Sequence, residues 1–231
     1  MRHENSSTSG GYLRDAIYGV NDGIITTFAI VAGVAGASLS REIVVILGFA
    51  NVIADGISMG MSSYLGMKSQ RDFEARQRAR EEMEIQLFPQ EEREEVRNMY
   101  QAKGFSGVEL ERAVEIITGN KKRWVDEMMI GEHGVITGNE ETPWSHGVVT
   151  FVAFIVAGTL PLIPFVLFGA GGHDFWISVA STATTLFFVG SLRTLLTKQG
   201  WLKSGLEMLV IGLIAAGASY GIGALISSLV K

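Results

Sequence analysis

The chain has 231 residues, of which 47% are hydrophobic and 28 are glycine, and it carries a formal net charge of −5 with no cysteine. The lack of cysteine excludes a disulfide framework, thiolate metal sites and thiol redox chemistry. Seventeen of the 24 acidic residues lie between Asp72 and Glu141, while the flanking parts of the chain are almost uncharged. This uneven distribution predicts a protein that meets two solvents, lipid and water.

Five apolar stretches are long enough to cross a bilayer, which takes about 20 residues of helix. They cover residues 16–37, 43–65, 146–170, 175–196 and 206–230. A soluble protein with buried helices is the alternative, but five such stretches would leave too little polar surface to cover them. The polar N-terminus lacks the apolar core of a signal peptide, so we expect the first stretch to remain in the mature protein. We predict an all-α integral membrane protein with five transmembrane helices.

The segment between the second and third apolar stretches is predicted to be helical. Residues 68–88 contain no glycine or proline and extend the second stretch as one continuous helix. Pro89 then marks a helix start and Gly104 its end, and two further helices are expected over 106–119 and 121–135. The expected organisation is 1–66 with the first two transmembrane helices, 67–142 as an inserted helical metal-binding domain, and 143–231 with the last three transmembrane helices.

Lysine and arginine are distributed unequally between the two sides that five spans define. One side holds those of the N-terminus, of the inserted domain and of the loop before the fifth span, whereas the other holds only Arg41 and Lys231. By the positive-inside rule, the N-terminus and the inserted domain are expected in the cytoplasm. Both a prokaryotic cell membrane and a vacuolar membrane fit this orientation.

The inserted domain contains an acidic run, with seven glutamates in the sixteen residues from Glu81 to Val96. The pairs Glu81/Glu84 and Glu92/Glu95 each have a spacing of three residues, which places both carboxylates on one helix face. Like charges at this spacing destabilise a helix, and a bound divalent cation would reverse that penalty. Carboxylates suit hard and borderline ions such as Mn²⁺ and Fe²⁺. The alternative is a solvated acidic face balanced by arginines, which is the common fate of charge runs.

A second group of potential ligands follows in the sequence DEMMIGEH. Met128 and Met129 precede Glu132 by four and three residues, a spacing that puts thioethers and carboxylate on one helix face. Methionines at helical spacing are more often core residues, but these lie among charges, and the mixture favours Fe²⁺ over Ca²⁺ or Mg²⁺. His133 directly follows Glu132, which is the wrong spacing for the Glu-x-x-His motif of a di-iron oxidase. The histidine is therefore not assigned to the site.

Polar residues in the first two apolar stretches predict a path for cations. Asp22 lies deep enough in the first stretch to mark an ion or proton path, because a carboxylate in lipid is costly. The alternative is a helix-capping aspartate near the membrane surface. We favour the path for Asp22 and leave both interpretations open for Asp15, which lies two turns earlier on the same face. Asn51, Asp55 and Met59 follow one another at intervals of four in the second stretch. They form a polar and thioether stripe on one helix face.

A glycine motif in the fifth stretch and three histidines outside the acidic run are weaker functional signals. Gly217 and Gly221 form a G-x-x-x-G that allows close helix contact and is weak evidence for a dimer. His3, His146 and His173 lie in the tail or at the ends of apolar stretches and are interpreted as incidental. The sequence offers neither a nucleophile–base arrangement nor a histidine-rich site, so we do not expect an enzyme.

Long ordered motifs carry a family resemblance: RDAIYGVNDGIITTFAIVAGVAGA, ADGISMGMSSYLGMKSQRD, the charged segment from REEMEI to WVDEMMIGEHG, and LPLIP. With the glycine-rich last span they cover nearly the whole chain, which resembles the vacuolar iron transporter family of plants and fungi and its prokaryotic relatives. The resemblance implies a five-helix homodimer with a cytoplasmic metal-binding domain, exporting Fe²⁺ from the cytoplasm in exchange for protons.

The resemblance also implies site residues, position by position. The family's metal ligands fall on Glu81, Glu84, Glu92, Glu95, Met128, Met129 and Glu132, and its membrane pathway falls on Asp22 and Met59, with Asp15 nearby. Plant members carry a glutamate where this chain has Asn51, and the carboxylate here is Asp55, one turn later.

The resulting hypothesis is a proton-coupled exporter of Fe²⁺ that also accepts Mn²⁺ or similar divalent ions, with Co²⁺ and Zn²⁺ as further candidates. The expected partners are these ions, protons, the lipid bilayer and a second copy of the chain; nucleic acid is not expected. Two alternatives stay open: a passive divalent-cation channel, and a membrane-anchored metal buffer or sensor. Coupling of metal flux to a proton gradient separates the exporter from the channel, and a buffer would need the glutamates but not Asp22.

Overall fold

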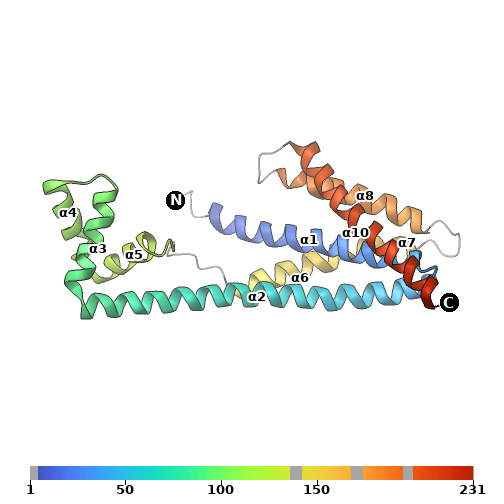
Figure 1. Cartoon of the computed structure of the whole chain (residues 1–231), viewed down its shortest axis with the longest axis horizontal. Coiled ribbons are helices and arrows are strands. Elements are labelled where there is room, and N and C mark those ends of the chain that lie inside the picture. The colour runs from blue at the N-terminus through green and yellow to red at the C-terminus, as the bar shows by residue number, and fades with distance from the viewer. Residues whose placement is uncertain (1–4, 136–141, 168–173, 195–199, 231) are drawn as a thin grey trace. The chain divides into compact units, whose positions relative to one another are not determined.

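The computed structural model describes residues 5–135, 142–167, 174–194 and 200–230, and within these ranges all regular structure is helical. The helices are α1 Asn5–Gly36, α2 Arg41–Leu87, α3 Pro89–Ala102, α4 Gly107–Thr118, α5 Lys121–Gly131, α6 Pro143–Thr159, the 3₁₀ helix η1 Leu160–Leu162, α7 Ile163–Leu167, α8 Asp174–Leu192 and α10 Trp201–Val230 (Figure 1). The ends of the third and fourth predicted stretches, 168–170 and 195–196, lie outside the described residues.

Five helices are long and apolar enough to cross a membrane: Gly10–Gly36 of α1, α2, Pro143–Leu167, Phe175–Leu192 of α8, and α10. This confirms the predicted class, an all-helical chain with five candidate membrane spans. Both α1 and α10 begin earlier than their apolar stretches, because no proline interrupts the polar residues ahead of them.

The third span is not one continuous helix. Pro161 lies in η1 and Pro164 in α7, and a proline both lacks an amide hydrogen and clashes with the carbonyl four residues earlier. The α-helix therefore gives way to a short 3₁₀ turn. The Ser178 hydroxyl of α8 donates to the Pro161 carbonyl at 2.8 Å, which supplies a donor where the helix is broken.

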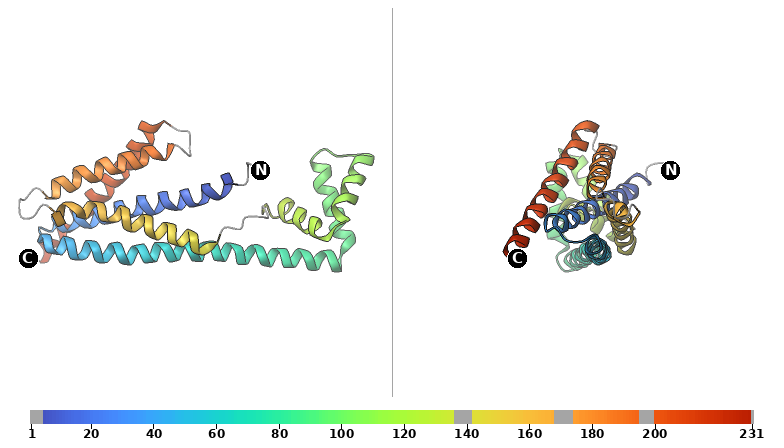
Figure 2. Two further views of the ribbon diagram at one scale, coloured as in Figure 1. Left: turned by 180° about the vertical axis from the view of Figure 1, so that it is seen from behind. Right: turned by 90° about the vertical axis from the view of Figure 1, so that its right-hand side faces the viewer.

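The chain divides into two compact units, residues 1–65 with 142–231, and residues 66–141. In the first unit α1 is the central helix and packs against α6, α8 and α10 (Figure 2). Its buried side chains include Ile24, Phe28 and Val31. Gly23 lets α1 approach α6 backbone to backbone, since a Cβ there would lie 2.6 Å from the carbonyl oxygen of Phe154.

The first part of α2 packs against α6 through small residues spaced four apart. A Cβ on Gly60 would lie 2.9 Å from both the Gly147 carbonyl oxygen and Cβ of Phe151. The apolar side chains that flank this contact on α2, such as Ile53 and Ile57, are exposed. Exposed apolar surface of this extent is typical of a face that meets lipid or another protein.

The tightest contact of α10 with α1 does not use the Gly217–Gly221 motif. A Cβ on Gly36 would collide with the carbonyl of Tyr220, and one on Gly223 would collide with the carbonyl of Gly33, whereas Gly217 and Gly221 have nothing within 4 Å. The small residues of the motif therefore leave an open surface on α10 within the described chain.

The second unit holds the last part of α2 and helices α3, α4 and α5. The predicted continuous helix is confirmed, since α2 runs unbroken to Leu87. It ends there because the residue before Pro89 is disfavoured in a helical conformation. Gly104, with φ of +98°, lies in the turn after α3. The unit has its own apolar core, formed by Ile85, Val96, Leu110, Val114, Trp124, Val125, Met128 and Met129.

Candidate functional site

Five glutamates predicted as metal ligands gather in the second unit: Glu81 and Glu84 near the end of α2, Glu92 and Glu95 on α3, and Glu132 at the C-terminal cap of α5. We call these five residues the glutamate cluster. The charges of the other four members all act on Glu92, and those of three members act on Glu95. The cluster is thus a tertiary arrangement that draws on three helices.

Two members of the cluster are buried. Glu81 is 1% exposed and Glu92 is 7% exposed, and within the described chain the Oε2 atom of each has no hydrogen-bond partner. Burial, followed by the charges of Glu95 and the rest of the cluster, raises the pKa of Glu92 to about 7. Burial and neighbouring glutamates also raise the pKa of Glu95. A cation among these carboxylates would supply the positive charge that the buried oxygens lack.

His133, which the sequence left outside the site, lies beside Glu81. Its Nε2 is 2.8 Å from Oε1 of Glu81. One ligand atom each from Glu81, Glu132 and His133 lie within 4.8 Å of one another, a grouping able to hold a metal ion. Spacing along a helix could not reveal this contact, because the histidine and Glu81 are 52 residues apart.

Two glycines shape the turn that carries His133. A Cβ on Gly131, the last residue of α5, would collide with the sulfur of Met99 on α3, so glycine permits this close approach. Gly134 has a φ of +66°, which glycine adopts without steric cost, and its amide donates to the Ile130 carbonyl at 3.2 Å. The turn therefore holds His133 in a defined place after α5.

Met128 and Met129 are both buried in the apolar core of the second unit, 0% and 1% exposed. This placement agrees with the usual role of methionine as a core residue. Their role as sulfur ligands stays a prediction.

Part of the acidic run is balanced by arginine and lysine. Nε of Arg80 lies 3.0 Å from Oε1 of Glu84, and a nitrogen of Arg97 lies 2.5 Å from Glu94. Exposed pairs of this kind contribute little stability. The solvated-face interpretation therefore fits exposed residues such as Glu94, whereas it does not fit the buried Glu81.

In the first unit, α1 and α2 bring together two predicted pathway residues. Asp22 and Asp55 are close enough for their charges to interact, and both are half-buried. The amide nitrogen of Asn51 donates to Oδ2 of Asp55 at 2.7 Å. Met59 lies one turn further along α2 and is also half-buried. The polar stripe of α2 and the carboxylate of α1 therefore belong to one region of the first unit.

Asp15 has a different partner. It is buried, and its Oδ2 contacts Nδ1 of the fully buried His146 on α6. Tyr12 stacks on the imidazole with 4.6 Å between ring centroids, and its hydroxyl lies 2.8 Å from Oγ of Ser145. The interpretation of His146 as incidental is wrong, because it is the buried partner of a predicted pathway residue. His3 and His173 lie outside the described residues.

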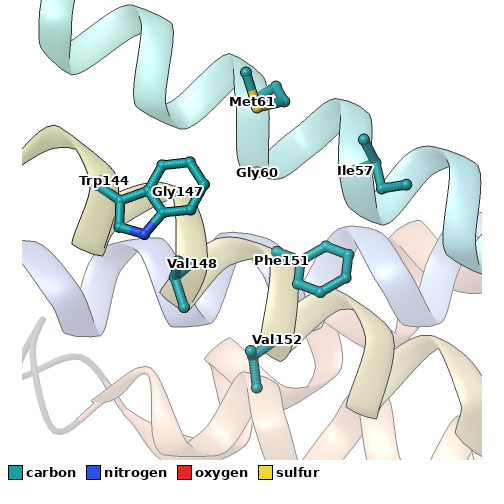
Figure 3. Close-up of a pocket in the computed structure, with 8 residues that line it drawn as sticks. All are labelled: Ile57, Gly60, Met61, Trp144, Gly147, Val148, Phe151 and Val152. Atoms are coloured by element: carbon teal, nitrogen blue, oxygen red, sulfur yellow. The ribbon is translucent and has the colours of Figure 1, made fainter.

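An apolar cavity of about 390 Å³ lies between α2 and α6. Its lining includes Ile57 and Met61 of α2 and Val148, Phe151 and Val152 of α6 (Figure 3). Apolar linings bind apolar groups. This cavity is therefore suited to hydrocarbon and not to a hydrated cation.

These features define a class: a multi-pass membrane protein with carboxylates among its apolar helices and a carboxylate–imidazole group in a separate helical unit. A model of the VIT family matches residues 13–224. Because the match covers most of the chain, the protein belongs to the VIT family, which confirms the resemblance in the motifs.

Similar proteins carry the name vacuolar iron transporter. One from Toxoplasma gondii is 36% identical over 99% of this chain and 79% of its own length. One from Plasmodium falciparum is 35% identical over 97% of this chain and 86% of its own length. Vacuolar iron transporter 1 of Arabidopsis thaliana is 34% identical over 94% of this chain and 87% of its own length.

Proposed function

We propose that this protein transports divalent metal ions across the membrane that it spans, with Fe²⁺ as its principal substrate. The observation that carries the proposal is the group formed by Glu81, Glu132 and His133, whose ligand atoms lie within 4.8 Å of one another. It occurs in a chain whose relatives are named vacuolar iron transporters. Carboxylate and imidazole donors together suit Fe²⁺, and the same donors accept Mn²⁺, Co²⁺ and Zn²⁺.

The glutamate cluster is proposed as the place where metal first binds. Burial, together with the charges of the other members, makes Glu92 costly to ionise and raises its pKa to about 7. A divalent cation removes the repulsion between these charges and gives a positive partner to the Oε2 atoms of Glu81 and Glu92, which have no hydrogen-bond partner among the described residues. Metal binding and charge relief therefore favour each other at this cluster.

The membrane path is proposed to run along Asp22, Asn51, Asp55 and Met59. A carboxylate among apolar spans is costly unless it lies near other polar groups, and Asp22 and Asp55 lie close enough for their charges to interact. Oxygen ligands with a thioether suit a borderline cation such as Fe²⁺. Asp15 is proposed to support the path from its buried contact with His146.

Transport is proposed to be coupled to proton movement in the opposite direction. Metal ligands bind in their deprotonated form, so binding of a cation releases protons wherever a ligand is protonated beforehand. Glu92, with a pKa of about 7, is such a group near neutral pH.

The proposed direction is out of the cytoplasm. Lysine and arginine are concentrated on the side of the N-terminus and of residues 66–141, and the positive-inside rule assigns that side to the cytoplasm. The glutamate cluster would then collect metal from the cytoplasm before it crosses.

A homodimer is proposed because the stripe of α2 borders an exposed face. Asn51, Asp55 and Met59 are only half-buried, and Ala54, on the same side of the helix, is exposed. Half-exposed carboxylates are costly in lipid, and a second copy of α2 packed on this face would shield them from it.

The test is Fe²⁺ flux into proteoliposomes under anaerobic conditions, with and without a pH gradient. We expect the wild-type protein to carry Fe²⁺ and to move protons the other way, and Asp22→Asn to abolish flux. Glu81→Gln should lower flux at low Fe²⁺ concentration, whereas Glu115→Gln, at an exposed carboxylate paired with Arg112, should match wild type. Flux indifferent to the gradient would indicate a channel. Metal binding without any flux would indicate a buffer and would contradict the proposal.

A further inference from the structure

We propose that His133 is a direct nitrogen ligand of the metal ion held by the glutamate cluster, and that this nitrogen biases the site toward Fe²⁺, Co²⁺ and Zn²⁺ over Mg²⁺ and Ca²⁺. The inference rests on the proposed function, since it concerns the same site. It adds a ligand that neither the motif spacing nor the family resemblance assigned.

The geometry around Glu81 is already close to that of a metal site. Nε2 of His133 lies 2.8 Å from Oε1 of Glu81. Two ligand atoms each about 2.1 Å from an ion and at right angles to each other would lie about 3.0 Å apart. Glu132 precedes His133 in the same turn, and its ligand atom lies within 4.8 Å of the other two. A small outward shift of the imidazole would place an ion between the three groups.

A hydrogen bond from His133 to Glu81 satisfies only one of the buried carboxylate oxygens of the site. It leaves Oε2 of Glu81, and Oε2 of Glu92, buried without partners within the described chain. A singly charged imidazolium would also face several carboxylates whose charges act on one another. A divalent ion held by His133 and Glu81 together brings more positive charge to the buried oxygens.

The burial of the imidazole supports a ligand role. Its side chain is 17% exposed and that of Glu81 is 2% exposed, so the Glu81 carboxylate is largely withdrawn from water while the histidine lies at the rim of the site. An ion that enters from solvent would meet the histidine and Glu132 before the buried carboxylate. The turn shaped by Gly131 and Gly134 keeps His133 and Glu132 at the rim of the site.

The imidazole nitrogen of His133 determines which metal ions gain most in affinity for the site. Imidazole binds zinc, iron, copper and nickel well, whereas Mg²⁺ and Ca²⁺ prefer oxygen ligands and water. An all-oxygen cluster would leave abundant Mg²⁺ as a competitor for the site. A site with His133 gives Co²⁺ and Zn²⁺ an advantage that Mg²⁺ does not share.

The experiment uses the purified full-length protein in detergent and the variant His133→Gln. The glutamine amide can still donate to Glu81 but is a poor metal ligand, so it separates a ligand role from a positioning role. Loss of an outer-sphere partner alone weakens metal binding about 10–100-fold, and we expect loss of this ligand to weaken Co²⁺ binding at least about tenfold, with Mg²⁺ binding changed less than about twofold. Glu115→Gln is the control and should bind as wild type does.

A second measurement does not depend on the variant. With Mn²⁺ bound to the wild-type protein, electron spin echo modulation should show the signal of a directly coordinated histidine nitrogen. The frequencies of this signal should change when histidine is labelled with ¹⁵N. In His133→Gln the signal should disappear. A wild-type site without coordinated nitrogen, or a variant with unchanged Co²⁺ affinity, would overturn the assignment. Glu81→Gln distinguishes failure of the histidine assignment from failure of the proposed function. If Glu81→Gln abolishes Co²⁺ binding while His133→Gln does not, the glutamate cluster remains the metal site and only the histidine assignment fails.

Discussion

His146 and Asp15 form a buried pair that joins α6 to α1 in the first unit. The imidazole is fully buried, the Asp15 side chain is 8% exposed, and Nε of Arg14 lies 3.7 Å from the same carboxylate. Since α1 is the central helix of this unit, the pair fixes the position of α6 along the axis of α1. A polar contact of this kind is specific in register where apolar packing tolerates sliding.

Removing one member of this pair should destabilise the protein strongly. His146→Ala leaves the buried Asp15 carboxylate without the imidazole, and breaking a buried pair typically costs about 3–5 kcal/mol. The double variant Asp15→Asn/His146→Ala also removes the buried charge of Asp15, and it should lose less stability than the two single changes together. Thermal unfolding in detergent, followed by tryptophan fluorescence, measures both. An unchanged unfolding temperature for His146→Ala would show that the contact is dispensable.

Two glycines of α2 should respond in opposite ways to alanine. At Gly60 a Cβ would lie 2.9 Å from the Gly147 carbonyl oxygen and from Phe151 Cβ, whereas at Gly66 nothing lies within 4 Å. Overpacking costs about 1–3 kcal/mol, so Gly60→Ala should lower the unfolding temperature. Gly66→Ala should be neutral or stabilising by up to about 1 kcal/mol, because alanine favours the helix. Equal effects at both positions would contradict the close packing of α2 on α6.

The stability of the metal-free protein should fall as pH rises toward and through neutrality. Burial and the surrounding glutamates raise the pKa of Glu92 from its ordinary value of 4.5 to about 7. Between these values the folded state holds a proton that the unfolded chain has released, so stability decreases with rising pH. The stabilising contribution is complete below the lower value and is lost as pH passes the higher one.

Glu92→Gln should flatten this dependence and raise stability at pH 8 in the presence of a chelator. The measurement is thermal unfolding at several pH values, with Glu115→Gln as an exposed control. Addition of Mn²⁺ should restore stability to the wild-type protein at pH 8, since the ion offsets the same repulsion. A wild-type protein whose chelated form gains stability between pH 5 and pH 8 would contradict the assigned pKa.

Asp55 should be required for flux but not for metal binding at the glutamate cluster. It accepts a hydrogen bond from Asn51 at 2.7 Å and its charge acts on Asp22. Asp55→Asn keeps the shape and removes the charge, and we expect Fe²⁺ flux in proteoliposomes to fall at least about tenfold, as for loss of a functional charge among spans. Ile53→Ala, at an exposed position on the opposite side of the same helix, should transport normally. Wild-type flux in Asp55→Asn would place the path elsewhere.

Local patterns in the sequence predicted much of the fold. The five apolar stretches, the continuous α2 to Leu87 and the helix start at Pro89 all follow from hydropathy and from the properties of proline, which act within a few residues. Helix ends were less accurate. The predicted helix over 121–135 ends at Gly131, and Gly134, which adopts a positive φ as Gly104 does, is the helix-end signal that this prediction overlooked. The motifs also sufficed for the family, which depends on residue order alone.

The pairing of functional groups was decided by tertiary structure. The glutamates could be predicted as ligands because their spacing placed them on helix faces, but the contacts of His133 with Glu81 and of His146 with Asp15 join residues 52 and 131 positions apart. Helical periodicity relates residues only within a few turns, whereas these contacts arise from packing between helices that are distant in the chain. The amino-acid sequence by itself therefore determined which segments are helical and apolar and which carry the acidic residues. Only the packing of those helices decided which histidine meets which carboxylate.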